Sequence, residues 1–267
     1  MTGNNGQAGP LAGTLAGQII ALTGGTRGLG LALAHALVAQ GARVALIGRD
    51  AATGAAAQAS VGTAARAYAA DVTDAAALAA TFAAIAQDLG PVDALVCAAG
   101  VSSGKAPIWE NGEAAYRHCF DINVLGVINA LGAAMPAMVA RAGGQVVVIG
   151  GTYGHKGVAG QGIYAASKWA VRGLVRSAAL DGAPHGVRVN MVSPGGIDGE
   201  RLRRLFSQSA ERNGEAPDAP YNRFVQSTAL GRLVGEDDVA RAVLHLLGPG
   251  GRMMTGQDIV VDAGTIL

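Results

Sequence analysis

The chain has 267 residues, a formal net charge of +1 and a hydrophobic content of 50%, with 4% aromatic and 15% charged residues. High hydrophobicity with little net charge excludes intrinsic disorder for most of the chain, and the lack of a basic excess excludes a nucleic-acid partner. The length fits one large α/β domain whose core is built from small side chains.

The N-terminal segment, residues 1–14, is predicted to be a flexible arm, because it has no sustained apolar pattern. It lacks the Lys and Arg residues of a secretory signal or a transit peptide. Cys97 and Cys119 have no paired spacing, which is typical of a reducing cytoplasm. We therefore expect a cytoplasmic protein. We also expect no metal, because the histidines lack ligand spacing, and no membrane partner, because no apolar run reaches about 18 residues.

Short apolar runs alternate with helical patterns along the chain. Seven runs have the composition of buried strands: residues 18–22, 44–47, 65–69, 93–98, 145–149, 188–192 and 258–261. Helical spacing follows the first run as far as Gly41 and recurs over residues 74–89, 113–141, 164–182 and 237–247. The alternation predicts a doubly wound α/β Rossmann fold in a single domain, residues 15–267. Its seven-stranded parallel sheet would carry helices on both faces.

Residues 200–227 interrupt the alternation. The segment is polar, contains Pro217 and Pro220, and is long for a connection. One helical face would collect Leu202, Leu205, Phe206 and Ser209, which predicts a short amphipathic helix. Two interpretations remain open for the segment: a lid over a substrate, or an ordinary surface helix packed on the domain.

The first predicted strand ends in the glycine-rich turn Thr23-Gly24-Gly25-Thr26-Arg27-Gly28-Leu29-Gly30. Glycines at these places allow a tight turn, let backbone N–H groups approach a pyrophosphate, and aim the positive end of the next helix at it. Glycine turns also occur for packing alone. The position at the first strand-to-helix junction of a βαβ unit favours a dinucleotide site.

A second signal is the run Tyr164-Ala165-Ala166-Ser167-Lys168. Residues four apart share one face of a helix, so the Lys168 ammonium can stabilise the Tyr164 phenolate and ready the phenol to exchange a proton with a substrate oxygen. An exposed Tyr and Lys on a surface helix is the alternative. The glycine turn in the same chain favours the catalytic interpretation.

With these motifs the chain resembles the short-chain dehydrogenase/reductase family, from about residue 15 to residue 267. The glycine turn is similar to the family's TGxxxGxG motif, and Tyr164 with Lys168 is similar to its catalytic YxxxK. Asn123 resembles the helix asparagine that holds a proton-relay water. Segments 188–195 and 255–264 resemble the family's sixth-strand and C-terminal signatures.

The resemblance implies a dinucleotide site and a catalytic group. The residues implied in cofactor binding are Thr23, Gly24, Thr26, Arg27, Gly28, Leu29, Gly30, Arg49, Asp71, Val72, Ala98, Ala99, Gly100, Tyr164, Lys168, Pro194, Gly195 and Ile197. The implied catalytic residues are Tyr164, Lys168 and Asn123. A homotetramer or homodimer is also implied, paired through the helices at residues 113–141 and 164–182.

Gly151 departs from the family pattern, because it stands thirteen residues before Tyr164, where the family has a serine. We predict that Thr152 replaces the missing hydroxyl, with Tyr153 and His155 as alternatives if the loop bends toward the substrate. A substrate with an internal hydrogen bond to its own carbonyl is a further option. Two smaller departures are Cys97-Ala98 at the start of the run 97–100, where the family has two asparagines, and the absence of a nicotinamide-binding threonine from residues 194–199.

The end of the second strand indicates the cofactor. Gly48 is followed by Arg49, so no acid stands where NAD-binding proteins place a carboxylate for the ribose. Arg27 and Arg49 can both face a 2′-phosphate, which predicts NADP(H). The alternatives are two exposed arginines and an Asp50 that turns toward the ribose.

We therefore predict an NADPH-dependent ketoreductase that acts on a small-molecule carbonyl. The expected substrate is bulky and mostly apolar, because five aromatic residues fall in loops near the expected site: Trp109, Tyr153, Phe206, Tyr221 and Phe224. These rings could instead only anchor their loops. Other options are a dehydrogenase working in the oxidative direction, a redox-neutral enzyme, and, since the serine is missing, a weakly catalytic NADP(H)-binding sensor.

Overall fold

The computed structural model describes residues 13–267, except for the side chain of Arg201. Most of the predicted arm, residues 1–12, lies outside the described residues. The described chain forms one parallel sheet in the order β3-β2-β1-β4-β5-β6-β7, which confirms the predicted fold class. The strands are β1 Ile19–Thr23, β2 Arg43–Gly48, β3 Ala65–Ala69, β4 Ala94–Cys97, β5 Gly144–Ile149, β6 Val187–Pro194 and β7 Asp258–Val261.

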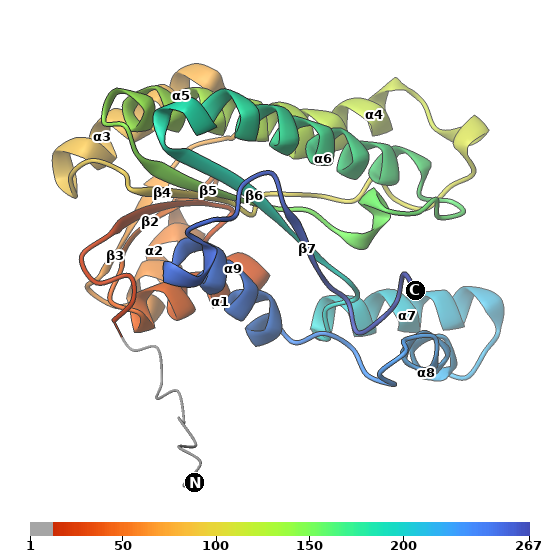
Figure 1. Ribbon diagram of the computed structural model, residues 1–267. Helices are drawn as coiled ribbons and strands as arrows, with labels where there is room; N and C mark the ends of the chain where they lie inside the picture. The colour runs from red at the N-terminus through yellow and green to blue at the C-terminus, as the bar shows by residue number, and fades with distance from the viewer. Residues whose placement is uncertain (1–12) are drawn as a thin grey trace, which may run out of the picture.

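Helices cover both faces of the sheet (Figure 1). One face carries α3 Ala75–Asp88, α4 Glu113–Phe120, α5 Gly126–Ala140 and α6 Gly162–Gly182. The opposite face carries α1 Gly28–Ala39, α2 Ala51–Val61 and α9 Glu236–Leu247. The strand order reverses between β1 and β4, and a crevice opens at such a point, beyond the carboxyl ends of the strands.

The sheet core has two faces because side chains alternate along each strand. In β1, Ala21 belongs to the cluster under α3, α5 and α6, whereas Ile20 and Leu22 belong to the cluster under α1 and α9. All five residues of β1 are buried. Strands that are buried on both faces have continuous apolar sequences, so a strand such as β1 could be predicted from its sequence alone.

Helix α2 was not predicted. Its sequence is rich in alanine and places only Gly54 and Ala57 in the core, so it has no apolar stripe to detect. Its start is fixed by Asp50, whose side chain accepts a hydrogen bond of 2.6 Å from the Thr53 backbone N–H.

The helix predicted over residues 113–141 is interrupted. A π-helical turn, Asp121–Leu125, separates α4 from α5. Over the described residues, Glu113–Ala140 is the one helix that is long and apolar enough to meet a criterion for crossing a membrane, with a mean hydropathy of 1.7 in its most apolar window. Buried α5 residues such as Val127 and Met138 belong to the sheet core, and core helices of globular domains meet the same criterion.

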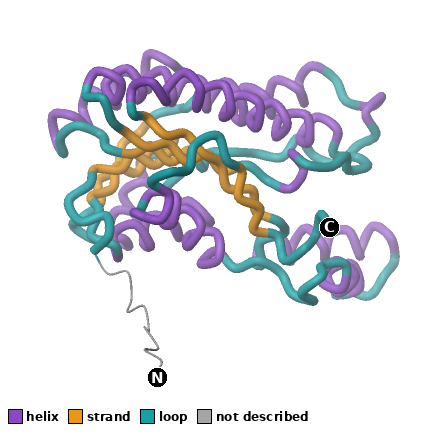
Figure 2. The backbone as a smooth tube through the Cα atoms, in the orientation of Figure 1, coloured by secondary structure: helices purple, strands orange, loops and turns teal. Residues whose placement is uncertain are grey.

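The segment predicted as a lid contains two helices, α7 Glu200–Asn213 and α8 Ala219–Gln226. The first is the expected amphipathic helix, and the second was not predicted. Figures 1 and 2 show this helical pair set apart from the two helical layers, close to the C-terminus. The pair is joined to the sheet through the end of β6, so it lies on the side of the molecule where the crevice opens.

Candidate functional site

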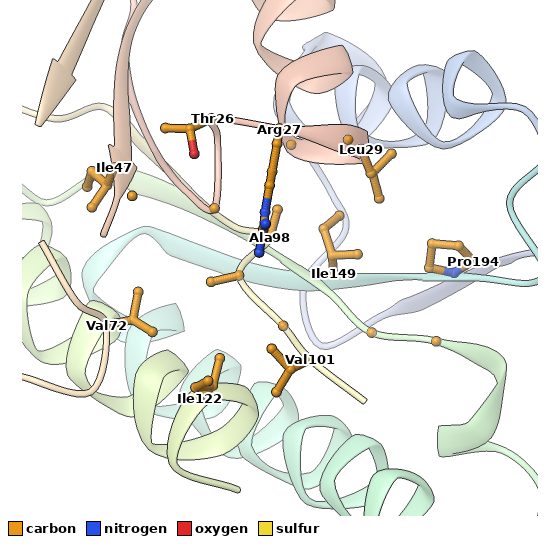
Figure 3. A pocket seen from close by; sticks show the side chains of 18 of the residues that line it. Thr26, Arg27, Leu29, Ile47, Val72, Ala98, Val101, Ile122, Ile149 and Pro194 are labelled. Atoms are coloured by element: carbon orange, nitrogen blue, oxygen red, sulfur yellow. The ribbon is translucent and has the colours of Figure 1, made fainter. Parts of the chain in front are cut away.

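A cleft of about 640 Å³ lies at the carboxyl ends of the central strands (Figure 3). All of the predicted cofactor-binding residues except Thr23 line it. Four cationic side chains and one carboxylate also line it: Arg27, Arg49, Lys168, Arg204 and Asp71. The size suits a dinucleotide-sized ligand, and the excess of positive charge suits one that carries phosphates.

The glycine turn forms one end of the cleft. Gly24 has φ +70°, and a Cβ atom on it would lie 2.6 Å from the Ala99 backbone nitrogen. A Cβ atom on Gly30 would collide with the Gly24 carbonyl oxygen. Among the described residues, no side chain caps the first turn of α1, so its N–H groups face the cleft without a protein acceptor. This arrangement can bind a phosphate or pyrophosphate.

Two arginines follow the first two strands. Figure 3 shows the Arg27 side chain extended from the glycine turn into the cleft. Arg49 lies 3.8 Å from Asp71, with 58% of its side chain exposed. Asp50 is turned away, because it caps α2 through Thr53, whose hydroxyl and backbone N–H lower the pKa of the Asp50 carboxyl. The alternative that Asp50 binds the ribose is therefore not supported. Arg27 and Arg49, which both line the cleft, are the charged side chains available at the end of β2.

Tyr164 and Lys168 lie one turn apart on α6 and both line the cleft. The Lys168 ammonium nitrogen is 5.5 Å from the centre of the Tyr164 ring and donates a 3.4 Å hydrogen bond to the Ile149 carbonyl. Lys168 is only 6% exposed, so its charge acts across little water. Tyr164 can therefore exchange a proton in the field of a fixed neighbouring cation.

Asn123 sits in the π-helical turn and is buried behind the cleft rather than lining it. Its amide nitrogen donates to the Val101 carbonyl at 2.9 Å and to the Ser167 hydroxyl at 3.0 Å, and its oxygen accepts from the Val101 N–H at 2.8 Å. One acceptor position of that oxygen remains. It lies beside Gly100, where a side chain would meet both Asn123 Oδ1 at 3.4 Å and Lys168 Nζ at 3.9 Å.

Gly151, not Thr152, forms the cleft wall beside Tyr164. Thr152 is only 4% exposed and is not among the lining residues, so the structure does not bring its hydroxyl to the cleft. His155 is bound elsewhere, with its Nε2 atom 2.8 Å from Asp258 on the edge strand. Tyr153 packs edge-on against Tyr164, with ring centres 5.6 Å apart. Burial, followed by the nearby Tyr164, raises the pKa of the Tyr153 hydroxyl.

Three of the five loop aromatics pack together in the lid segment. The Phe206 ring centre lies 5.3 Å from that of Phe224 and 6.1 Å from that of Tyr221. Phe224 also packs so closely on Gly196 that a Cβ atom there would collide with the ring. These rings anchor segment 200–227 to the residues that follow β6, so they no longer argue for a bulky substrate. Trp109 remains 82% exposed.

Nine lining residues were not predicted: Ile47, Gly48, Ala70, Val101, Ile122, Ile149, Gly150, Gly151 and Arg204. Most of them end a strand or follow one. The last residues of the predicted strands could therefore have been predicted to line the cleft. Arg204 carries no such signal, because α7 brings it to the cleft from a segment remote in sequence.

Comparisons with known proteins agree with this geometry. The short chain dehydrogenase family model matches residues 18–210. Galactitol 2-dehydrogenase of Agrobacterium fabrum is 33% identical over 92% of this chain and 96% of its own. NAD+-bound xylitol dehydrogenase superposes with a TM-score of 0.89 at 29% identity, over 94% of this chain and 99% of its own. A single-residue variant of actinorhodin polyketide ketoreductase with NADPH superposes with a TM-score of 0.88 at 28% identity, over 95% of this chain and 98% of its own.

Proposed function

The chain belongs to the short-chain dehydrogenase family, and on that premise we propose that it is an NADPH-dependent ketoreductase. Members of the family are oxidoreductases that act on alcohols and carbonyls with a nicotinamide cofactor. The observation that carries the proposal is the juxtaposition of Tyr164 and Lys168 with the uncapped start of α1 in one positively charged cleft.

The cleft fits a nicotinamide dinucleotide. Gly24 and Gly30 leave room for close approach of a pyrophosphate to the backbone, and Asp71 and Val72, two of the cofactor-binding residues that the family resemblance implies, line the same cleft. When bound, the reduced nicotinamide supplies a hydride to the substrate carbonyl carbon. The protein's own part is to place that carbonyl oxygen within hydrogen-bond reach of the Tyr164 hydroxyl.

Tyr164 is the proposed proton donor to the carbonyl oxygen. Lys168 stabilises the phenolate left behind and binds the nicotinamide ribose. Asn123 is the proposed anchor of a relay water, through the remaining acceptor position of its oxygen beside Gly100 and Lys168, from which the phenolate regains a proton.

NADPH is the proposed cofactor because Arg27 and Arg49 flank the end of β2 and Asp50 is engaged in capping α2. The test is kcat/KM with NADPH and NADH for wild type and Arg49→Ala. Wild type should prefer NADPH. In the variant, kcat/KM should fall about tenfold with NADPH and change little with NADH, because the lost contact is to the 2′-phosphate; the loss is modest because Arg49 is half exposed and its contact is partly screened. Equal efficiencies in wild type would reject this cofactor assignment.

A second candidate is alcohol oxidation on the same site. It is favoured by two relatives, named as a galactitol and a xylitol dehydrogenase, the latter with bound NAD+. A weakly catalytic NADP(H)-binding sensor is the third, suggested by Gly151. A panel of ketones with NADPH and of alcohols with NADP+ and NAD+ separates the three. The bulky, apolar substrate stays a proposal that now depends mainly on exposed Trp109.

We further propose a homodimer or homotetramer paired through α4–α5 and α6. Large hydrophobic side chains are exposed on these helices: Tyr116, Ile128, Trp169 and Leu180. A cytoplasmic location is proposed as well, supported by two cysteines that are both free and buried.

A further inference from the structure

The cleft has an open position at Gly151. A Cβ atom on this residue would lie 3.9 Å from each of its three nearest neighbours: the Tyr164 hydroxyl, Lys168 Cε and the Pro194 carbonyl oxygen. Its backbone, with φ 160°, is extended and open to any residue. The neighbouring Gly150 is different, because a Cβ atom there would lie only 2.7 Å from the Ser193 hydroxyl. Glycine at position 151 is thus required neither by conformation nor by packing, and it leaves space beside the proton donor.

Among the described residues, no other hydroxyl takes up this space. Thr152 does not line the cleft. The Ser193 hydroxyl is fully buried and accepts the Gly151 N–H at 3.3 Å, so it serves the backbone behind the wall. Tyr153 contacts the ring of Tyr164 and is not among the lining residues. The carbonyl would therefore meet the Tyr164 hydroxyl without a second side-chain hydroxyl donor.

We propose that the substrate supplies this second donor: it is a ketone with a hydroxyl group on the carbon next to the carbonyl. This inference rests on the proposed ketoreductase function. The carbonyl oxygen has to lie about 3 Å from the Tyr164 hydroxyl for proton transfer. The open position borders the same hydroxyl, so a substituent one carbon from the carbonyl reaches it. There its O–H can donate to the substrate's own carbonyl oxygen.

The lining of the open position suits a hydroxyl group. Two of its three nearest atoms are oxygens, from Tyr164 and Pro194, so the open position is bordered mainly by polar atoms. A donor aimed at the oxygen where negative charge develops contributes about 10²- to 10³-fold to kcat in other enzymes. We expect a preference of about that size for substrates that carry the hydroxyl.

The first test uses four ketones that share one large substituent and differ in the other, which is methyl, ethyl, hydroxymethyl or methoxymethyl. With NADPH, wild type should reduce the hydroxymethyl ketone with a kcat at least about a hundredfold above those of the ethyl and methoxymethyl ketones. The ethyl group matches the hydroxymethyl group in size, and the methoxymethyl group keeps the oxygen but cannot donate. Equal kcat values for the hydroxymethyl and methoxymethyl ketones would overturn the inference.

Two substitutions at the open position form a matched pair. Gly151→Ser adds a protein donor in the space that the methyl ketone leaves empty, so the methyl ketone should gain about tenfold or more in kcat and the preference for the hydroxymethyl ketone should collapse. Gly151→Ala fills the space without a donor, so it should slow the hydroxymethyl ketone and leave the methyl ketone no faster. A gain for the methyl ketone with alanine as well, or an unchanged preference with serine, would contradict the proposal.

Binding provides a readout that needs no turnover. In Tyr164→Phe saturated with NADP+, calorimetry should give an affinity for the hydroxymethyl ketone that falls at least about fivefold when Gly151→Ala is added. The affinity for the methyl ketone should not change, because its methyl group is too short to fill the space. Equal losses for both ketones would place the substituent elsewhere and overturn the inference. The proposed function fails separately, if wild type reduces none of the four ketones although it binds NADPH.

Discussion

At the scale of single residues, the cleft is defined by a buried cation beside a phenol and by a wall that carries no side chain. Lys168 donates a hydrogen bond to the Ile149 carbonyl at the end of β5, and its ammonium nitrogen lies 5.5 Å from the centre of the Tyr164 ring. Gly151 follows the same strand and lines the cleft beside them. The end of β5 therefore orients Lys168, and the glycine that follows it determines how much space is left for the substrate.

This geometry separates the roles of three hydroxyl side chains. Tyr164→Phe should lower kcat by about a thousandfold or more with any substrate, because the proton donor is removed. Thr152→Val should change kcat less than about threefold, since Thr152 does not line the cleft. Steady-state kinetics with NADPH, with cofactor binding measured separately, test both variants. A hundredfold loss in Thr152→Val would restore Thr152 as the replacement for the serine, and an unaffected Tyr164→Phe would reject the mechanism.

Tyr153→Phe is the matched control for Tyr164→Phe, because it removes the hydroxyl group of the other tyrosine in the same ring pair and keeps both aromatic rings. A small effect is expected. A loss comparable to that of Tyr164→Phe would identify Tyr153 as a second proton or hydrogen-bond donor.

At the scale of elements, α7 and α8 form one unit. It packs against the loop after β6, and it brings one cationic side chain, Arg204, to the cleft. Phe224 packs on Gly196, and Arg203 pairs with Asp198 at 2.9 Å, so both ends of the connection to β6 are fixed. Arg204 projects from α7 to line the cleft, and no hydrogen bond or ion pair of its side chain is present among the described residues. The apolar side of the segment packs on the molecule, and Arg204 lines the cleft; that the segment acts as a lid over a substrate stays a prediction.

Arg204→Ala should weaken cofactor binding about five- to twentyfold, because one charge-assisted contact to a phosphate is lost, less the screening at an exposed site. NADPH and NADH should be affected alike if the contact is to the shared pyrophosphate. Fluorescence titration at two salt concentrations measures this, and the loss should shrink at high salt. Arg212→Ala, on the last turn of the same helix, is the control and should bind as wild type does. An Arg204→Ala protein with unchanged affinities would show that α7 does not contact the cofactor.

At the scale of the whole molecule, the helical layer with α4, α5 and α6 exposes apolar side chains. Leu180 is 76% exposed, Trp169 48% and Ile128 45%. Exposed apolar groups gathered on one layer are typical of an interaction surface.

We predict that wild type sediments as a dimer or tetramer. Ile128→Asp should shift it toward smaller species at micromolar concentration, because a charge would be buried without a partner at the interface. Leu205→Asp, on α7 outside this layer, should leave the mass unchanged. Analytical ultracentrifugation tests both variants, with circular dichroism to verify folding. A wild-type monomer, or an Ile128→Asp protein of unchanged mass, would contradict the proposed interface.

Much of this molecule is determined by local sequence. Central strands such as β1 and β4 are buried on both faces and form continuous apolar runs, whereas the partly exposed edge strands β3 and β7 were found as short runs between helical patterns. Long amphipathic or apolar helices were found from their periodicity. The glycine turn and the Tyr164–Lys168 pair were also predictable, because each depends on neighbours within a few residues. Helix α2 was missed because alanines give a helix no apolar stripe.

Other features were decided only by the tertiary structure. Which hydroxyl reaches the cleft depends on how the loop after β5 folds against α6 and β7. There His155 binds Asp258, which follows it by more than a hundred residues. Arg204 enters the cleft because α7 packs through Phe206 onto α8, whose Phe224 packs on Gly196 after β6. Short-range spacing sets strands, turns and residues one helical turn apart, whereas contacts between segments distant in the chain depend on the packing of the whole molecule.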